Sequence, residues 1–173
     1  LAVICGAPSW ALAAGPPFEL SVKKDRVWGA SRGTLVVGQD DPAYGAFLNW
    51  MYFSDATLTF PQTLVLRYSQ LEPEERRNPQ VAGDYAKWFL GRLRAVEAAT
   101  ANGQNLCAGR FTAADIVNGY ALRLAGNIGL AKDFGPNVSA YWARLQEPDG
   151  YQRAFAAERK AGVQQNVAPR VRA

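Results

Sequence analysis

Four residues between positions 50 and 57 have the types and spacing of a binding wall for an apolar small molecule. At positions i, i+3, i+4 and i+7, and therefore on one face of a helix, lie Trp50, Phe53, Ser54 and Thr57. Two aromatic rings with two hydroxyls suit a mostly apolar ligand. The alternative is that Trp50 and Phe53 pack inside a helical bundle, because aromatic stripes are usually core. The sequence leaves both interpretations open.

Groups for acid–base, nucleophilic or metal chemistry are scarce. The chain of 173 residues has no histidine, which removes the commonest general base, metal ligand and physiological-pH switch. Cys5 and Cys107 are far apart and lack a CxxC spacing, so neither a disulfide scaffold nor a metal site is indicated. Cys107 lies in an apolar run, which favours a small buried hydrophobe over a reactive thiol.

Charge and hydropathy exclude two further classes of protein. The formal net charge is +4, but the arginines are scattered and form no stripe with interleaved aromatic residues. We interpret Arg76–Arg77 and the pair Arg92 and Arg94 as solvated helix faces, and expect no nucleic-acid binding. No apolar run reaches 18 residues, so we expect no membrane span.

The strongest local motif is a helix start. The Thr112 side chain is placed to accept the backbone N–H of Asp115, whose carboxylate can reach back to the N–H of Thr112. This is a capping box with Asp in the usual Glu or Gln position. Phe111 and Ile116 bracket it at the spacing of a hydrophobic staple, so a helix is predicted from Ala113. We expect its apolar face to carry residues that recur every four positions, Ile116, Tyr120 and Leu124, and to be extended by Val117 and Ala121.

Caps and turn residues predict four more helices. Asp41 before Pro42 suits an N-cap followed by Pro at N1, and that helix should bend at Pro61, which has no N–H to donate. Other predicted boundaries are Asn78–Pro79, Asn102–Gly103, Gly135–Pro136, a capping box of Asp149 with Gln152, and an end near Gly162. No segment alternates with a period of two. The prediction is an all-α fold with five main helices.

Three separated segments resemble one family in its order. LCAGRFTAADIVNGYALRLAGNIGL resembles the capped, buried sixth helix of the glutathione S-transferase C-terminal domain. FLNWMYFSDATLTFPQTLVLRYSQLEPEERR resembles the Pro-kinked first helix of that domain in bacterial members, and GPNVSAYWARLQEPDGYQRAFAAER resembles its closing helices. The resemblance runs from about Asp40 to Lys160 without gaps. It implies a five-helix bundle over residues 39–162, followed by a tail over 163–173.

The resemblance also implies a function. The family conjugates glutathione to hydrophobic electrophiles, with glutathione as co-substrate and no bound cofactor, and its members are cytoplasmic homodimers. By this resemblance, Trp50, Phe53, Ser54 and Thr57 correspond to the wall of the electrophile site. The competing hypothesis is a non-catalytic helical module that binds apolar ligands or protein partners.

Residues 1–38 depart from the family pattern. Similar transferases begin with a thioredoxin-like domain of roughly 80 residues, which holds glutathione and activates its thiol. Here Pro16–Lys24 resembles only its first loop and helix start, and no cis-Pro segment or γ-glutamyl clamp follows. We expect an irregular remnant without a glutathione site, unassigned catalytic residues despite nearby Cys5 and Ser9, and a weakened dimer. A signal peptide over Leu1–Ala14 is the alternative interpretation, although it lacks a basic start.

Overall fold

A computed structural model describes residues 22–23, 26–27 and 35–166 of the chain. The chain divides into two units, Leu1–Val36 and Val37–Ala173. The described residues of the first unit form an antiparallel hairpin of β1 (Val22–Lys23) and β2 (Arg26–Val27). The interpretations of Cys5, Ser9, the thioredoxin-like pattern and the signal peptide lie outside the described residues.

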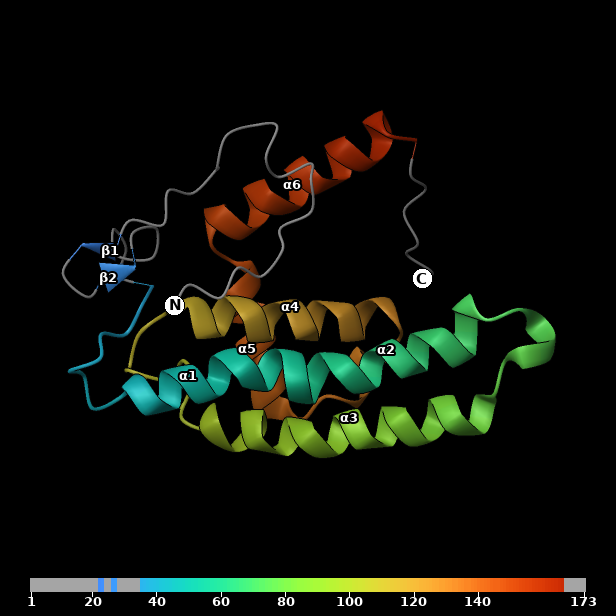
Figure 1. Ribbon diagram of the computed structural model, residues 1–173, viewed down its shortest axis with the longest axis horizontal. Coiled ribbons are helices and arrows are strands. Elements are labelled where there is room, and N and C mark those ends of the chain that lie inside the picture. Colours follow the sequence, from blue (N-terminus) through green and yellow to red (C-terminus); the bar gives the residue numbers. More distant parts are fainter. Residues whose placement is uncertain (1–21, 24–25, 28–34, 167–173) are drawn as a thin grey trace. The chain divides into compact units, whose positions relative to one another are not determined.

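The described part of the second unit is helical (Figure 1). One long helical segment combines α1 (Tyr44–Phe53), π-helical turns over Ser54–Thr59, α2 (Phe60–Leu66) and further π-helical turns over Arg67–Leu71. The later helices are α3 (Pro79–Ala99), α4 (Ala113–Asn127), α5 (Pro136–Gln146) and α6 (Asp149–Gln164). Short 3₁₀ turns cover Glu74–Arg76 and Ala131–Asp133. With the first segment counted as one helix, the predicted all-α bundle of five helices is confirmed.

The sequence predicts a bend of the first helical segment at Pro61. The structure has π-helical turns directly before this proline. Pro61 lies in the first turn of α2, directly after the wide turns Ser54–Thr59. A proline inside a helix removes one backbone donor and its ring clashes with the carbonyl four residues earlier. Widening the preceding turns relieves both problems, and the Thr59 hydroxyl donates to the carbonyl oxygen of Ser54 at 2.9 Å.

The predicted N-cap at Asp41 is wrong by two residues. The helix begins at Tyr44 with Ala43 at the N-cap position. Asp41 instead accepts the backbone N–H of Ala43 on its Oδ1 atom at 2.8 Å. This local bond closes a turn before the helix, an alternative conformation that Asp side chains favour.

The predicted start of α3 is confirmed. The Asn78 side chain accepts the backbone N–H of Val81 at 3.1 Å, and Pro79 occupies the first helical position. Gly135 and Pro136 likewise open α5. The α5 cap comes from another helix, because Glu97 on α3 accepts the N–H groups of Asn137 and Val138 at 3.0 and 2.9 Å.

The predicted capping box of α6 does not form. Pro148 is the N-cap residue and no side chain caps the helix. The Gln152 amide donates to the carbonyl oxygen of Gln146 at 2.7 Å, so it is not available to the α6 start. Asp149 lies inside the first turn, where its charge complements the helix dipole. The helix also continues past Gly162 to Gln164.

In Figure 1 α1 and α2 run end to end, and the segment that they form lies between α3 and α4. Apolar side chains of the helices form the core. The core includes Leu58, Phe89, Leu93, Val96, Ala121, Leu122, Val138 and Tyr141. Within the described residues, no helix is long and apolar enough to cross a membrane.

The predicted apolar face of α4 is wrong in part, because Ala121 is buried in the core but Val117 is only half-buried. Ile116 and Tyr120 are 48% and 56% exposed, and Leu124 is half-buried. The buried face instead carries mostly small and polar residues, Ala114, Asp115, Asn118, Gly119, Ala121, Leu122 and Ala125. Small residues let neighbouring helices approach α4 closely, since a Cβ added to Gly119 would lie 3.0 Å from a Leu145 methyl group.

Candidate functional site

The predicted wall on the first helical segment lies against the core. Trp50 and Phe53 are half-buried and pack on the core, with their rings edge-to-face at 5.1 Å. The Ser54 side chain is buried, and its hydroxyl donates to the carbonyl oxygen of Val117 at 2.6 Å. Thr57 is half-buried. Ser54 therefore has a structural bond to α4 whatever else it does.

Three side-chain bonds join the first helical segment to α4. Besides the Ser54 bond, the Asn118 amide donates to the carbonyl oxygen of Trp50 at 2.8 Å. The Gln62 amide donates to the carbonyl oxygens of Ala121 at 3.0 Å and Leu58 at 3.1 Å. Buried donors need such partners, and these carbonyls supply them. The bonds hold the irregular turns, and with them the predicted wall, at a fixed place on α4.

Asp115 is the centre of a buried hydrogen-bond cluster at the start of α4. Its Oδ1 atom accepts from the backbone N–H of Leu106 at 3.0 Å and from the Tyr141 hydroxyl at 2.8 Å. Its Oδ2 atom accepts from the backbone N–H of Thr112 at 2.8 Å and from the Thr112 hydroxyl at 3.2 Å. Thr112 Oγ1 accepts the N–H of Ala114 at 3.2 Å, and both halves of the predicted capping box are present.

This cluster has the character of a structural element. Burial, with the neighbouring Asp115 carboxylate, raises the pKa of Tyr141 far above its usual value. Burial also raises the pKa of Cys107, whose sulfur lies 3.6 Å from the Thr112 hydroxyl. A thiol with a raised pKa is a poor nucleophile at neutral pH. The predicted buried, unreactive state of Cys107 agrees with this geometry.

An apolar groove lies between α4 and α6, with a cavity volume of about 450 Å³. Its α4 side carries the exposed residues Ile116 and Tyr120, next to Phe111, which is 39% exposed. Its α6 side carries Tyr151 and Phe155. Phe111 and Ile116, the predicted staple, thus both line an open groove.

The rings of the groove form a continuous row. Trp142 of α5 meets Tyr151 edge-to-face at 5.8 Å, and Tyr151 stacks on Phe155 at 6.3 Å. The Arg123 guanidinium lies 5.0 Å from the centre of the Phe155 ring, a cation–π distance. The groove wall is therefore aromatic from α5 to the middle of α6.

One ion pair crosses the rim of the groove. Arg123 of α4 donates from both terminal nitrogens to the Glu158 carboxylate of α6, at 2.5 and 2.8 Å. The hydrogen bond from Arg123 lowers the pKa of Glu158, and the bond to Glu158 raises the pKa of Arg123. Both groups are charged at neutral pH, and they neutralise each other.

A smaller cleft of about 220 Å³ lies between α2 and the end of α4. Its lining is mixed, with Thr59, Gln62, Thr63, Gln70, Leu124 and Asn127 among its residues. The Gln62 Oε1 atom is buried without a hydrogen-bond partner, but it is also closed off from solvent. The unpaired Gln62 oxygen is therefore not accessible to a ligand in this cleft.

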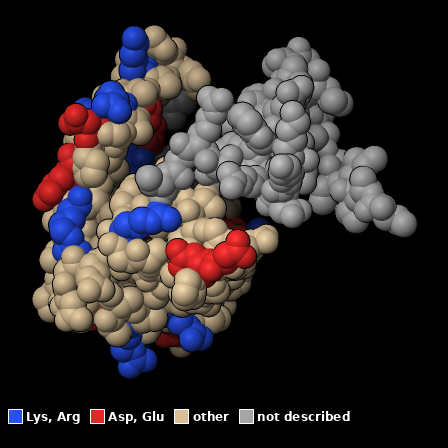
Figure 2. Space-filling view, turned by 90° about the vertical axis from the view of Figure 1, so that its left-hand side faces the viewer, with Lys and Arg blue, Asp and Glu red and all other residues tan. Residues whose placement is uncertain are grey.

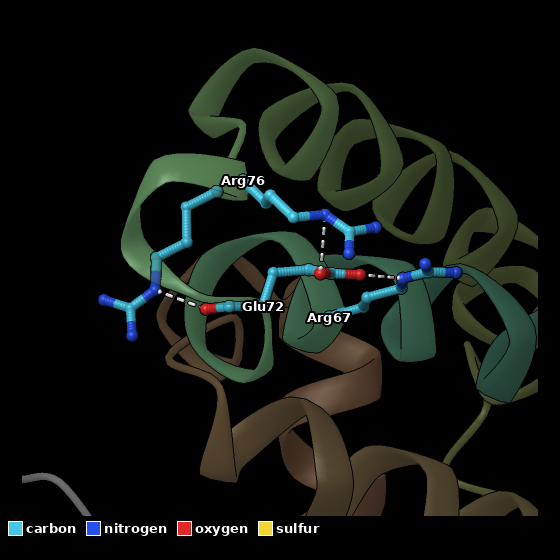
Figure 3. Close-up of polar contacts among 4 residues, drawn as sticks. Arg67, Glu72 and Arg76 are labelled. Atoms are coloured by element: carbon cyan, nitrogen blue, oxygen red, sulfur yellow. Dashed lines mark hydrogen bonds and ion pairs between the residues drawn. The ribbon is translucent and has the colours of Figure 1, made fainter.

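The turn between α2 and α3 holds a second charged cluster (Figure 3). The Glu72 carboxylate lies between two guanidinium groups, 2.7 Å from Arg67 Nε and 3.4 Å from Arg76 Nε. Arg77 donates to the Glu72 backbone carbonyl at 3.0 Å. Arg76 and Arg77, predicted as solvated, are exposed but bonded to this turn. The view in Figure 2 likewise shows positive and negative side chains interspersed.

An exposed aromatic cluster lies where α2 meets α3. Phe60 and Trp88 are 51% and 44% exposed, with their rings edge-to-face at 6.4 Å. Tyr85 stacks on Trp88 at 5.5 Å, and the Arg92 guanidinium lies 6.0 Å from the Trp88 ring. Trp88 therefore lies on the exposed side of α3, whereas the adjacent Phe89 is buried in the core.

The sequence interpretation missed the groove. Neither cavity is lined by Trp50, Phe53, Ser54 or Thr57. Tyr151 and Phe155 stand four residues apart and so share one face of α6, a signal that could have indicated an aromatic wall. The opposite wall of the groove, formed by Ile116 and Tyr120 of α4, was predicted to face the core.

Comparison with known proteins gives matches at the level of structure. No protein-family model matches the chain, and no characterised protein matches it in sequence. The glutathione transferase URE2P5 from Phanerochaete chrysosporium matches 77% of the chain with a TM-score of 0.67 and 20% identity. The transferase URE2P8 of that organism, with oxidised glutathione, matches 76% with a TM-score of 0.63 and 18% identity. Glutathione S-transferase III in its apo form matches 74% with a TM-score of 0.62 and 20% identity.

The matched region spans 61%, 60% and 61% of these three transferases respectively. The identities are low, so the matches establish architecture rather than activity. The order of helices and the buried capping box agree with the resemblance read from the sequence. The helical part of this chain therefore has the fold of glutathione transferases, as their all-helical C-terminal domain displays it.

Proposed function

We propose that this chain is a member of the glutathione S-transferase family and that its helical domain contributes the electrophile wall of a glutathione-conjugating site. The observation that carries the proposal is the fold match over 77% of the chain. URE2P5 has been cocrystallised with 1-(S-glutathionyl)-2,4-dinitrobenzene, and Ure2p with glutathione. Family membership also implies a cytoplasmic protein.

In this proposal the first helical segment contacts the electrophile. The rings of Trp50 and Phe53 supply apolar surface, and Thr57 supplies a hydroxyl at the edge. Ser54 acts as a positioning residue, because its hydroxyl already donates to Val117. The bonds from α4 to this segment support the proposal, since a binding wall needs a fixed geometry.

Conjugation requires a glutathione thiolate, and the buried cluster around Asp115 has no free group to generate it. The Asp115 carboxylate accepts four hydrogen bonds, and the Tyr141 hydroxyl donates to it. Cys107 is buried with a raised pKa. In this proposal the helical domain supplies electrophile contacts, and thiolate activation comes from groups outside this buried cluster. If none exists, the chain is a non-catalytic module for apolar ligands or protein partners.

Glutathione affinity shows whether the 173-residue chain holds a complete conjugating site or only the electrophile wall. We expect titration calorimetry of the 173-residue chain to show little glutathione binding, and an aryl halide assay to show conjugation near background. Thr57→Val, which removes one hydroxyl, should still shift apolar ligand affinity by about twofold, while Thr63→Val serves as an exposed control. Robust turnover that is lost in Ser9→Ala or Cys5→Ala would instead show a working glutathione site near the start of the chain.

We also propose weak homodimerisation through the exposed aromatic cluster of Phe60, Tyr85 and Trp88. Large exposed rings that touch one another are typical of contact surfaces. Sedimentation velocity over a concentration series should show a reversible dimer that Trp88→Ser weakens. Tyr52→Ser removes a more exposed ring outside the cluster and should leave the dimer unchanged. A tight dimer that does not dissociate on dilution would contradict the proposed weakening.

A further inference from the structure

We propose a covalent modification site beyond the proposed function: Asn102, in the turn after α3, deamidates spontaneously through a succinimide. The chain contains two Asn-Gly pairs, Asn102–Gly103 and Asn118–Gly119. A glycine after asparagine favours this reaction, because a residue without a Cβ leaves its backbone nitrogen free to approach the asparagine side chain. Both pairs therefore have the same chemistry in the sequence, and the structure makes them different.

The reaction needs only the two residues and water. The backbone nitrogen of Gly103 attacks Cγ of Asn102, the bond from Cγ to the amide nitrogen breaks, and ammonia leaves with the proton of the Gly103 N–H. The product is a cyclic succinimide. Water then opens the ring at either carbonyl, which converts the asparagine to aspartate or isoaspartate and removes one unit of net positive charge from the chain. Neither step transfers electrons.

Asn102 lies in an open turn. Asn102, Gly103 and Gln104 are all exposed, and within the described residues no hydrogen bond holds the Asn102 side chain. Gly103 has a φ of +68°, and a Cβ added to it would meet no atom within 4 Å. One bond opposes the attack, because the Gly103 N–H donates to the carbonyl oxygen of Thr100 at 3.0 Å. A single turn bond in an exposed loop opens at little cost in free energy.

Asn118 has the opposite surroundings. It is fully buried, and its amide donates to the carbonyl oxygens of Trp50 and Ala114, both at 2.8 Å. Gly119 lies inside α4 at a place of close helix packing, where an added Cβ would meet Leu145 at 3.0 Å. Attack at Asn118 would require its amide to leave both acceptors and α4 to unwind, which costs much of the free energy of unfolding. The helix therefore protects Asn118, and the turn leaves Asn102 reactive.

The modified turn leads directly to the Asp115 cluster. Leu106 follows the turn and donates its backbone N–H to Asp115 at 3.0 Å. Isoaspartate routes the backbone through the side chain of residue 102 and so lengthens the chain by one methylene ahead of that bond. We therefore expect the isoaspartate form to lower the protection of the Leu106 amide against hydrogen exchange. Asn102→Asp adds the charge without the extra methylene and should keep that protection.

Incubation of the full chain at mildly alkaline pH, followed by trypsin digestion and mass spectrometry, tests the proposal. The two Asn-Gly pairs fall in adjacent tryptic peptides, 95–110 and 111–123, because the cleavage sites are Arg94, Arg110 and Arg123. We expect deamidation to accumulate at least about tenfold faster in peptide 95–110, since Asn118 reacts only when α4 opens. In denaturant the two peptides should react at similar rates, so the chain is its own control.

Two variants locate the reaction within peptide 95–110. Asn102→Gln should abolish it, because glutamine would have to close a larger ring. Asn105→Gln changes the other asparagine of the same peptide, which precedes a leucine, and should leave the rate unchanged. Labelling by an isoaspartate-specific methyltransferase identifies the branched product. Circular dichroism of each variant reports whether the helical bundle is intact.

Several outcomes would overturn the assignment. They are equal rates for the two peptides of the folded chain, deamidation of peptide 95–110 that persists in Asn102→Gln, or a product without isoaspartate. A folded chain that stays intact at Asn102 while the denatured chain reacts would also overturn it, and would show that the bond from Gly103 to Thr100 protects the turn. Glutathione takes no part in these measurements, so their failure is distinct from failure of the proposed conjugation.

Discussion

Asp115 and Ile116 are neighbours in the sequence but lie in differently packed regions of the molecule. Asp115 is fully buried and accepts four hydrogen bonds from Leu106, Thr112 and Tyr141. Ile116 is 48% exposed and borders an open groove. The polar residue is therefore inside the bundle and the apolar one is at its surface.

This difference teaches that satisfaction of hydrogen bonds, and not hydropathy, orients α4. A buried carboxylate is tolerated only when its oxygens have partners, and the capping box supplies two of them locally. Once Asp115 is placed inward, the helical period turns Ile116 and Tyr120 outward. The groove follows from the cluster, because the rings displaced from the core line it.

The largest expected effect comes from breaking the cluster. Asp115→Ala leaves the N–H groups of Leu106 and Thr112 and the Tyr141 hydroxyl without their acceptor. We expect the free energy of unfolding to fall by about 4 kcal/mol, because several buried donors lose their partner. Chemical denaturation measures the change, with Asp55→Ala as an exposed control on the first helical segment. A loss below about 1 kcal/mol would contradict the central role of Asp115.

Tyr141→Phe removes a single bond from the cluster. The charged acceptor makes this bond stronger than average, so we expect a loss of about 2 kcal/mol. The raised pKa of Tyr141 adds a pH dependence: the buried group keeps its proton when the unfolded chain loses it near pH 10.0. Its contribution is therefore complete below that pH and declines above it. Tyr141→Phe should flatten the alkaline decline in stability, whereas Tyr52→Phe, an exposed tyrosine, should not.

Thr112→Ala tests the local half of the cluster. The lost helix cap should cost about 1 kcal/mol, less than the loss of Asp115. Asn78→Ala, which removes the cap of α3, should have a similar effect and calibrates the measurement. Thermal melts rank the variants. If Thr112→Ala lowered the stability more than Asp115→Ala, Thr112 and not Asp115 would be the centre of the hydrogen-bond cluster.

The rim of the groove should respond far more weakly. Arg123 and Glu158 are partly exposed, so Glu158→Gln should cost about 0.3 kcal/mol. The lowered pKa of Glu158 means that its contribution is present above the ordinary value of 4.5 and is lost as the pH falls below it. Protection factors of the α6 amides, which are corrected for the intrinsic pH dependence of exchange, should therefore fall at low pH in the parent chain and change less in Glu158→Gln. An equal loss of protection in both would remove the ion pair as a cause.

We expect the smallest effect on stability from a substitution at Ile116, the residue next to Asp115. Ile116→Ser should change the free energy of unfolding by no more than about 0.5 kcal/mol, since its side chain is already half in water. Denaturation beside Asp115→Ala makes the comparison direct. A loss of several kcal/mol would show that Ile116 belongs to the core, as the four-residue periodicity first indicated.

The number and order of the helices, and several of their starts, could be predicted from the sequence. The caps at Asn78 and Thr112 form as predicted because each bond joins atoms within three residues of one another. Such bonds depend little on the rest of the fold. The same locality explains why proline and glycine marked the start of α5 correctly.

Only the tertiary structure decided which faces are buried and which partners meet. Glu97 caps α5 from α3, 40 residues away in the chain, and Tyr141 reaches Asp115 across 26 residues. The predicted capping box of α6 failed because Gln152 found a better acceptor in Gln146. The periodicity of apolar residues shows which residues share a helix face, but not which element packs against that face. The contact of α4 with α6 therefore could not be predicted from periodicity.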